Sequence, residues 1–185
     1  MEKFRGFIAI DIKSFPKLLE FENEIKKTGA NVKLVEPKNI HLTLKFLGDT
    51  DEILINNIEK IMKDSIEEIK PFEICLRGAG VFPNEKYIKV VWIGIENGEK
   101  IAQIANNIDE NISNLGFLRD RREFSAHLTI ARVKNVNNKQ ALIDSINKYR
   151  DVEFLKMNVD TIKLKKSTLT PKGPIYSTLK EIKIN

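Results

Sequence analysis

The sequence predicts an α+β protein whose mainly antiparallel sheets are flanked by helices. The expected strands and helices do not follow the strict alternation that produces a parallel sheet. Two strand-like stretches, 40–47 (IHLTLKFL) and 126–133 (AHLTIARV), repeat the tripeptide His-Leu-Thr, and each follows a long helix and a loop. The 42% of hydrophobic residues is enough for a packed core. We therefore expect one bilobal domain, 1–185, of two tightly packed pseudo-symmetric lobes, each half supplying one of these strands.

The first half of the chain shows apolar runs separated by helical periodicity. An amphipathic helix begins near Ser14 and closes at Gly29, a residue type suited to a helix end. A second helix is expected from Thr50, its capping residue, to the residue before Pro71, with two acidic residues in its first turn. The strands expected in this half are 4–12, 32–36 and 40–48.

The second half is richer in strands. A long amphipathic helix is expected over 98–116 and a shorter one near 139–150. The turn PNEK (83–86) indicates a hairpin, and the Pro/Gly stretch TLTPKGP (168–174) indicates a loop. The strands expected here are 72–82, 87–95, 125–133, a pair within 152–167, and 175–184.

Composition narrows the function classes. The formal net charge of +5 favours an anionic partner. The single cysteine excludes an internal disulfide and a zinc site built on cysteines, and we expect no metal. No apolar run resembles a signal peptide or a membrane span, so we expect a cytoplasmic protein that does not associate with membranes.

The two histidines of the chain, His41 and His127, are both followed by Leu-Thr. In a regular strand, residues two apart point to the same side. The second copy then has His127 and Thr129 on one face, and the first copy has His41, Thr43 and Lys45 on one face with Leu42, Leu44 and Phe46 on the other. One strand histidine is usually structural, but two in the same tripeptide indicate catalysis. One imidazole can accept a proton while the other donates one near pH 7, and a threonine hydroxyl can bind a phosphoryl oxygen.

The motifs HLTL and HLTI resemble the signature of the 2H phosphoesterase superfamily, and most of all its RNA 2′,3′-cyclic phosphodiesterases, historically called 2′-5′ RNA ligases. The blocks FRGFIAIDI, NIHLTLKFLGD, VFPNEKYIKVVWIGI, AHLTIARVK and KKSTLTPKGPIY extend the resemblance over nearly the whole chain. The resemblance implies a bilobal fold with both motifs lining a central cleft, and no metal or nucleotide cofactor. It also implies an RNA substrate, such as a tRNA fragment, whose 2′,3′-cyclic phosphate is hydrolysed to a 2′-phosphate, with reverse 2′-5′ ligation in some members.

The resemblance also implies roles for individual residues. His41 and His127 would be the general acid and the general base, Thr43 and Thr129 would bind the phosphate, and Arg132 would neutralise its charge. Arg132 is five residues after His127, so a regular strand would turn it to the opposite face. We therefore expect this strand to end or to bulge near Ala131.

Further residues are candidates for RNA contacts. Phe7 and Trp92 could stack on a base, although a core role suits them better. The remaining candidates are Arg5 on the first strand, Ser167 and Tyr176 on either side of the Pro/Gly loop, and the arginines of the loop before the second motif, Arg119, Arg121 and Arg122.

Three other functions fit the sequence less well. A non-catalytic RNA- or nucleotide-binding module would not need two proton-transferring groups. A 2H phosphoesterase for another cyclic nucleotide or a 2′-5′ oligonucleotide would differ in the loops around the site. ATP-dependent ligation is disfavoured because the chain has no G-x-x-x-x-G-K-[ST] motif. We expect the protein to act as a monomer.

Overall fold

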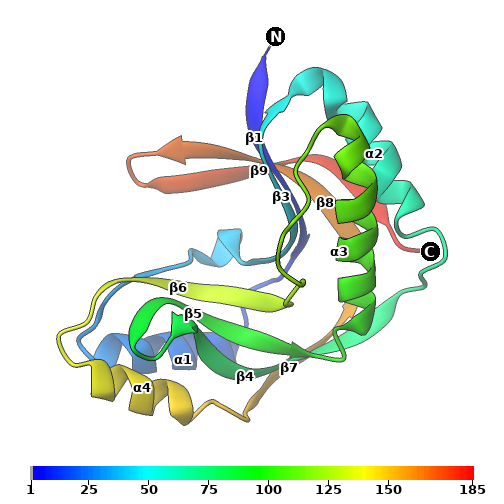
Figure 1. Ribbon diagram of the computed structural model, residues 1–185. Helices are drawn as coiled ribbons and strands as arrows, with labels where there is room; N and C mark the ends of the chain where they lie inside the picture. Colours follow the sequence, from blue (N-terminus) through cyan, green and yellow to red (C-terminus); the bar gives the residue numbers. More distant parts are fainter. Residues whose placement is uncertain (1) are drawn as a thin grey trace.

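The computed structural model describes residues 2–185. Within this range the structure has nine strands, four α-helices and three short 3₁₀ segments (Figure 1). The strands are β1 Lys3–Asp11, β2 Asn31–Leu34, β3 His41–Asp51, β4 Phe72–Asn84, β5 Tyr87–Glu96, β6 His127–Asn135, β7 Glu153–Val159, β8 Thr161–Thr170 and β9 Gly173–Lys183. The helices are α1 Pro16–Lys27, α2 Ile55–Asp64, α3 Glu99–Ile112 and α4 Lys139–Asn147, and the 3₁₀ segments are η1 Pro37–Asn39, η2 Glu52–Leu54 and η3 Ser113–Leu115.

The strands form two sheets, and every pairing within them is antiparallel. The first sheet has the strand order β3-β1-β8-β9, and the second has the order β2-β6-β5-β4-β7. This arrangement confirms the predicted α+β class with antiparallel sheets.

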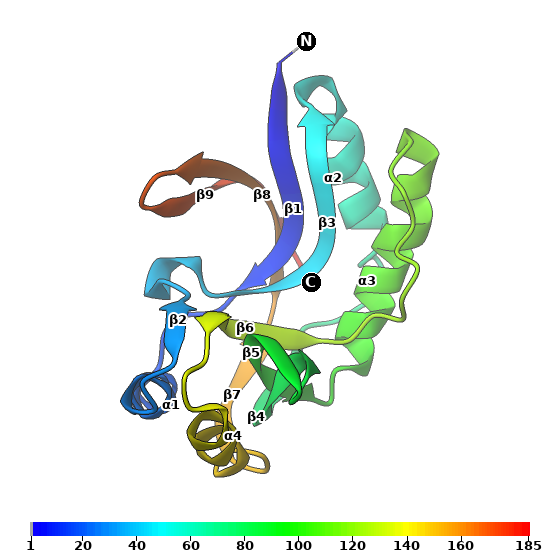
Figure 2. The ribbon, with the colours of Figure 1, turned by 60° about the vertical axis from the view of Figure 1, so that its left-hand side comes forward.

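The chain passes between the two sheets more than once. α1 follows β1 of the first sheet but packs beside α4 and β7 under the second sheet, whereas α3 follows β5 of the second sheet but packs on β3 and α2 (Figures 1 and 2). β2 comes from the first half of the chain and pairs with β6 in the second sheet. These crossings join the two sheets without a linker and place each motif strand beside elements from the other half.

Apolar side chains at helical spacing explain why the helices cover the sheets. In α3, isoleucines recur every three or four residues and are fully buried against β3 and α2: Ile101, Ile104, Ile108 and Ile112. Strand residues such as Ile8, Leu42, Ile93 and Leu128 supply the sheet side of the same continuous core. The opposite side of each sheet is therefore left for polar and aromatic residues.

Thr50 does not cap the second helix as predicted. β3 continues to Asp51, and Thr50 is buried opposite Phe4 of β1 with its hydroxyl donating to the Gly48 carbonyl, 3.1 Å away. Gly48 has a positive φ of 68°, which absorbs an irregularity in the pairing with β1 and lets the strand go on. The helix is consequently shorter than predicted and ends at Asp64.

The Pro/Gly stretch after residue 167 is part of a hairpin, and not the predicted long loop. β8 extends to Thr170 and β9 begins at Gly173, so the turn between them is only two residues long. The hydroxyl of Thr170 donates to the Gly173 carbonyl and closes this turn. Pro171 lies in the turn itself, where it needs no ladder hydrogen bond, and Pro174 is the second residue of β9, opposite Leu169.

Candidate active site

The imidazoles of the two motifs are held in the same way. His41 Nδ1 lies 2.6 Å from the Asn39 carbonyl oxygen, and His127 Nδ1 lies 2.8 Å from the Ser125 carbonyl oxygen. A carbonyl oxygen can only accept, so each Nδ1 carries the proton and donates it two residues back along the chain. In both rings this leaves Nε2 as the nitrogen that can accept or release a proton during a reaction.

The two motif strands lie close together because β2 connects them. β2 pairs with β6, and its extension donates from Val35 N to the Ile130 carbonyl, 2.8 Å away. The chain then turns through η1 and enters β3 at His41, and β3 contacts β6. The sequence motif alone contained no sign of this connection, which depends on a four-residue strand.

Matching bulges occur in both motif strands. Leu44 in β3 and Ile130 in β6 are extra residues in the pairing with the neighbouring strand, so residues 44–45 and 130–131 are all buried. The strand parity changes at this point, and Arg132 returns to the side of His127 and Thr129. The predicted interruption near Ala131 is confirmed.

The same bulge corrects the expected orientation of the first motif. Lys45 was expected beside His41 and Thr43, but it is turned inward and its side chain is only 2% exposed. Phe46 was expected in the core, but it is 69% exposed and its ring lies 6.5 Å from that of Phe7 on the histidine side. The unpaired Leu44 shifts the alternation by one residue, so Lys45 and Phe46 each point to the side opposite to the one expected.

Aromatic rings surround both imidazoles. The centroid of His41 lies 5.0 Å from Phe7 and 5.3 Å from Tyr176, and the Tyr176 ring meets it edge-on. His127 has a comparable edge-on neighbour in Phe82, 5.0 Å away, which in turn lies 5.2 Å from Trp92. Phe82 was not predicted as a site residue because its sequence context is that of an ordinary strand, and the pairing of β4 with β5 places it here.

Arg5, Ser167 and Tyr176 form a row across the first sheet. Arg5 pairs with Ser167, and Ser167 pairs with Tyr176. Ser167 and Tyr176 therefore belong to strands, and do not flank a loop as predicted. Burial raises the pKa of the Tyr176 hydroxyl, while the positive charges of Arg132 and Arg5 partly offset this rise. The charge of Arg132, on the second sheet, thus acts on Tyr176 of the first.

Burial lowers the pKa of His41. The Asn39 carbonyl opposes this effect, the Lys165 ammonium adds to it, and the Asp11 carboxylate opposes it. Lys165 is buried and forms an ion pair with Asp11, which also accepts Lys163 at 3.1 Å. The neutral imidazole is therefore favoured at His41 in the free protein.

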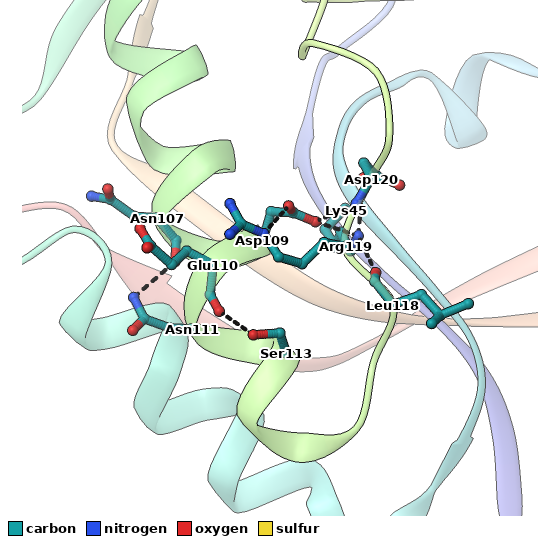
Figure 3. A network of polar contacts seen from close by, with 9 residues as sticks. All are labelled: Lys45, Asn107, Asp109, Glu110, Asn111, Ser113, Leu118, Arg119 and Asp120. Atoms are coloured by element: carbon teal, nitrogen blue, oxygen red, sulfur yellow. Dashed lines mark hydrogen bonds and ion pairs between the residues drawn. The ribbon is translucent and has the colours of Figure 1, made fainter.

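A polar network on the other side of β3 holds the arginine-containing loop (Figure 3). The buried Lys45 ammonium contacts Asp109 of α3 at 2.5 Å, Asp120 at 3.0 Å and the Leu118 carbonyl at 2.9 Å. Arg119 also reaches Asp109, at 3.4 Å. The first motif strand is thereby joined to the segment that leads into the second motif. Arg121 and Arg122 on this segment are exposed.

Two further properties bear on the chemistry. Among residues 2–185, no three His, Cys, Asp or Glu side chains are grouped as a metal ion would require. In the same part of the chain, no helix is both long and apolar enough to cross a membrane.

Comparisons with known proteins point to one family. Residues 16–168 match the family model of the 2′-5′ RNA ligase superfamily. The chain is 46% identical over 179 residues to the RNA 2′,3′-cyclic phosphodiesterase of Methanocaldococcus jannaschii, covering 96% of this chain and 99% of the relative. It is 40% identical over 184 residues to the enzyme of the same name from Methanothermobacter thermautotrophicus, covering 98% and 100%. The crystal structure of TT0787 from Thermus thermophilus superposes with a TM-score of 0.78 at 26% identity, covering 97% of each chain.

Proposed function

Because the chain belongs to the 2′-5′ RNA ligase superfamily and, within it, to the RNA 2′,3′-cyclic phosphodiesterases, we propose that it hydrolyses 2′,3′-cyclic phosphate ends of RNA to 2′-phosphate ends. The observation that carries this proposal is the matched pair of imidazoles, each held through Nδ1 so that Nε2 remains available. A simple RNA-binding module would have no use for this pairing.

The reaction divides between the two histidines. His127 Nε2 takes a proton from water as the water oxygen attacks phosphorus. The bond from phosphorus to the 3′ oxygen breaks, and His41 Nε2 gives its proton to that oxygen. The products are a free 3′-hydroxyl and a 2′-phosphate. The assignment of the acid to His41 and the base to His127 follows the family resemblance, since the two motifs are alike in geometry.

Thr43, Thr129 and Arg132 stabilise the charge that builds on the phosphoryl oxygens. The two threonines are partly exposed and lie two residues after their histidines, on the same side. Arg132 adds a permanent positive charge, and its planar guanidinium can donate two parallel hydrogen bonds to a phosphoryl group. The equivalent position after the first motif is Phe46, so the positive charge enters from the second sheet.

The low pKa of His41 has to be reconciled with an acid role. In the free protein, burial favours the neutral ring, which cannot donate from Nε2. A bound cyclic phosphate brings a negative charge next to the imidazole, and this favours the protonated form. Substrate binding would therefore load His41 with the proton that it delivers.

Ligation of two RNA ends would use the same groups. When the 5′-hydroxyl of a second RNA takes the place of water, the same displacement forms a 2′-5′ bond. This activity needs no nucleotide cofactor, because the cyclic phosphate already carries an activated bond.

A panel of RNAs tests the proposal. Oligonucleotides ending in 2′,3′-cyclic phosphate, 2′-phosphate or 3′-phosphate are incubated with the protein in EDTA and without ATP, and the products are separated. We expect only the cyclic end to react and the product to be the 2′-phosphate. His41→Ala and His127→Ala should each lose most of the activity. A 3′-phosphate product, a strict metal requirement, or full activity in either variant would overturn the proposal.

A further inference from the structure

A cationic hollow lies on the second sheet, beyond the histidine pair. Its volume is about 870 Å³, within the range that accommodates a small ligand such as a nucleotide. Its lining residues come from β4, β5, the turn between them and the loop that follows α4. The residues that matter for its chemistry are Gly80, Trp92, Arg77, Lys86, Arg150 and Glu85.

Aromatic residues connect the hollow to the candidate active site, because Trp92, which lines the hollow, lies next to Phe82 and Phe82 lies next to His127. Trp92 pairs directly with Thr129 in the sheet, so both side chains stand on the same face. Phe82 lies between Trp92 and His127, with its ring centroid 5.2 Å from the first and 5.0 Å from the second. An RNA strand with its phosphate at His127 would therefore lead along Phe82 towards the hollow.

Trp92 forms the aromatic wall of the hollow. Its ring lies directly over Gly80, where a Cβ atom would stand only 2.3 Å from the ring. Its indole nitrogen is buried without a hydrogen-bond partner among the described residues, so the ring is held by packing alone. Aromatic side chains of this kind stack on RNA bases without requiring a particular base.

The positive charges of the hollow are only weakly engaged. Arg77 approaches Glu96 at 3.5 Å and Arg150 approaches Glu85 at 3.6 Å, and the four side chains are between 45% and 65% exposed. Exposed ion pairs at such distances contribute little to the free energy of folding, so both guanidinium groups can turn towards a phosphate. Lys86, in the turn, is exposed as well.

We propose that this hollow binds the RNA nucleotide adjacent to the one that reacts, with its base stacked on Trp92 and its flanking phosphates on Arg77 and Arg150. This inference rests on the proposed function, because it assumes a single-stranded RNA substrate that enters by its end. It adds a specificity: the protein prefers an oligonucleotide with a cyclic end over a mononucleoside 2′,3′-cyclic phosphate. Glu85 limits the affinity, since its carboxylate repels the phosphate that Arg150 binds.

The test compares a long and a short substrate. The double variant Arg77→Ala/Arg150→Ala should lower kcat/KM for a cyclic-ended oligonucleotide about tenfold or more and leave that for the mononucleoside 2′,3′-cyclic phosphate unchanged. The slope of log affinity against log salt should fall by about 1.4, or roughly 0.7 for each of two lost single-strand phosphate contacts. Glu85→Gln should shift oligonucleotide affinity in the opposite direction. The control, Lys26→Ala/Lys60→Ala, removes two exposed lysines from α1 and α2 and should leave kcat/KM unchanged for both substrates.

A binding measurement separates this inference from the proposed function. Trp92 is the only tryptophan of the chain, so its fluorescence reports stacking directly. An oligonucleotide with a 2′-phosphate end should quench the emission. The double arginine variant should need an oligonucleotide concentration about tenfold higher for the same quenching. If neither substrate is hydrolysed but quenching persists, the proposed function fails and the binding site stands. Equal loss on both substrates, no loss on either, or absence of quenching would overturn the hollow as an RNA site.

Discussion

The ammonium group of Lys45 lies 2.5 Å from the carboxylate of Asp109, although Lys45 sits in the motif strand and Asp109 in α3. The Lys45 side chain is 2% exposed and the Asp109 side chain 14% exposed, so this pair is largely removed from water. The positive charge and the hydrogen bond from Lys45 hold the pKa of Asp109 low against the effect of burial. The pair joins the strand of one histidine to the segment that leads to the other.

Replacing Lys45 should therefore reduce stability strongly. Lys45→Met removes the charge and leaves the partly buried Asp109 with only Arg119 and the Asp120 backbone N–H as partners, at a cost of about 3 kcal/mol in the free energy of unfolding. Urea denaturation measures this change. Asp120→Asn is the matched control, because Asp120 is 65% exposed and its contact with Lys45 should contribute less than about 1 kcal/mol. Equal effects of the two variants would show that Lys45 is not anchored by Asp109.

The buried position of His41 predicts an unusual pH dependence. We expect the pKa of its imidazole in the free protein to lie below the ordinary value of about 6.5. An NMR titration of the histidine ring signals measures this pKa. The chain has only two histidines, so the signal lost in His41→Ala assigns both. If His41 is the acid, kcat/KM falls as the pH rises through this lowered pKa, because the free protein then lacks the proton.

The kcat profile provides the complementary check. It reports the complex, where the phosphate charge raises the pKa of His41, so the alkaline limb of kcat should lie at higher pH than that of kcat/KM. Coincident limbs, or a free-protein pKa above 6.5, would contradict the loading of His41 by the substrate.

Arg132 should act through both its charge and its shape. Arg132→Ala is expected to lower kcat about 100-fold, the size of effect typical for losing one group that stabilises transition-state charge. Arg132→Lys should recover part of this loss, because it keeps the charge but not the two-pronged guanidinium. Lys134→Ala, an exposed change two residues along the same strand, should leave kcat unchanged. A similar loss in Lys134→Ala would indicate that β6 itself had been disturbed.

The residues around Arg132 also show which features of the motif strands can be predicted from the sequence and which cannot. Hydrophobic alternation correctly indicated both motif strands and the shared side of histidine and threonine. It also indicated that Arg132 required an irregular strand. It could not reveal that Leu44 and Ile130 are the unpaired residues, since this depends on the pairing with the neighbouring strands. The inward turn of Lys45 follows from that one feature.

Other parts of the site depend on contacts between distant segments. Phe82 and Asn39 looked like ordinary residues of a strand and a turn. Asn39 accepts from His41 through its carbonyl, and its side-chain amide donates to the Pro174 carbonyl, 135 residues away in the chain. Backbone carbonyls exist at every position, so their use as imidazole partners becomes visible only when the fold brings them together.

The close approach of Gly80 and Trp92 gives the last prediction. In Gly80→Ala the new methyl group would overlap the indole ring, so the ring must leave its position or the strands must separate. We expect a loss of about 1–3 kcal/mol in unfolding free energy together with a shift of tryptophan emission, which reports on Trp92 because the chain has one tryptophan. Gly98→Ala is the control: its φ is negative and the added Cβ meets Ile95 at an ordinary 3.5 Å. Unchanged emission in Gly80→Ala would mean that the ring does not rest on this glycine. A displaced ring should also weaken quenching by RNA, which would connect the packing of one glycine to the binding of a nucleotide.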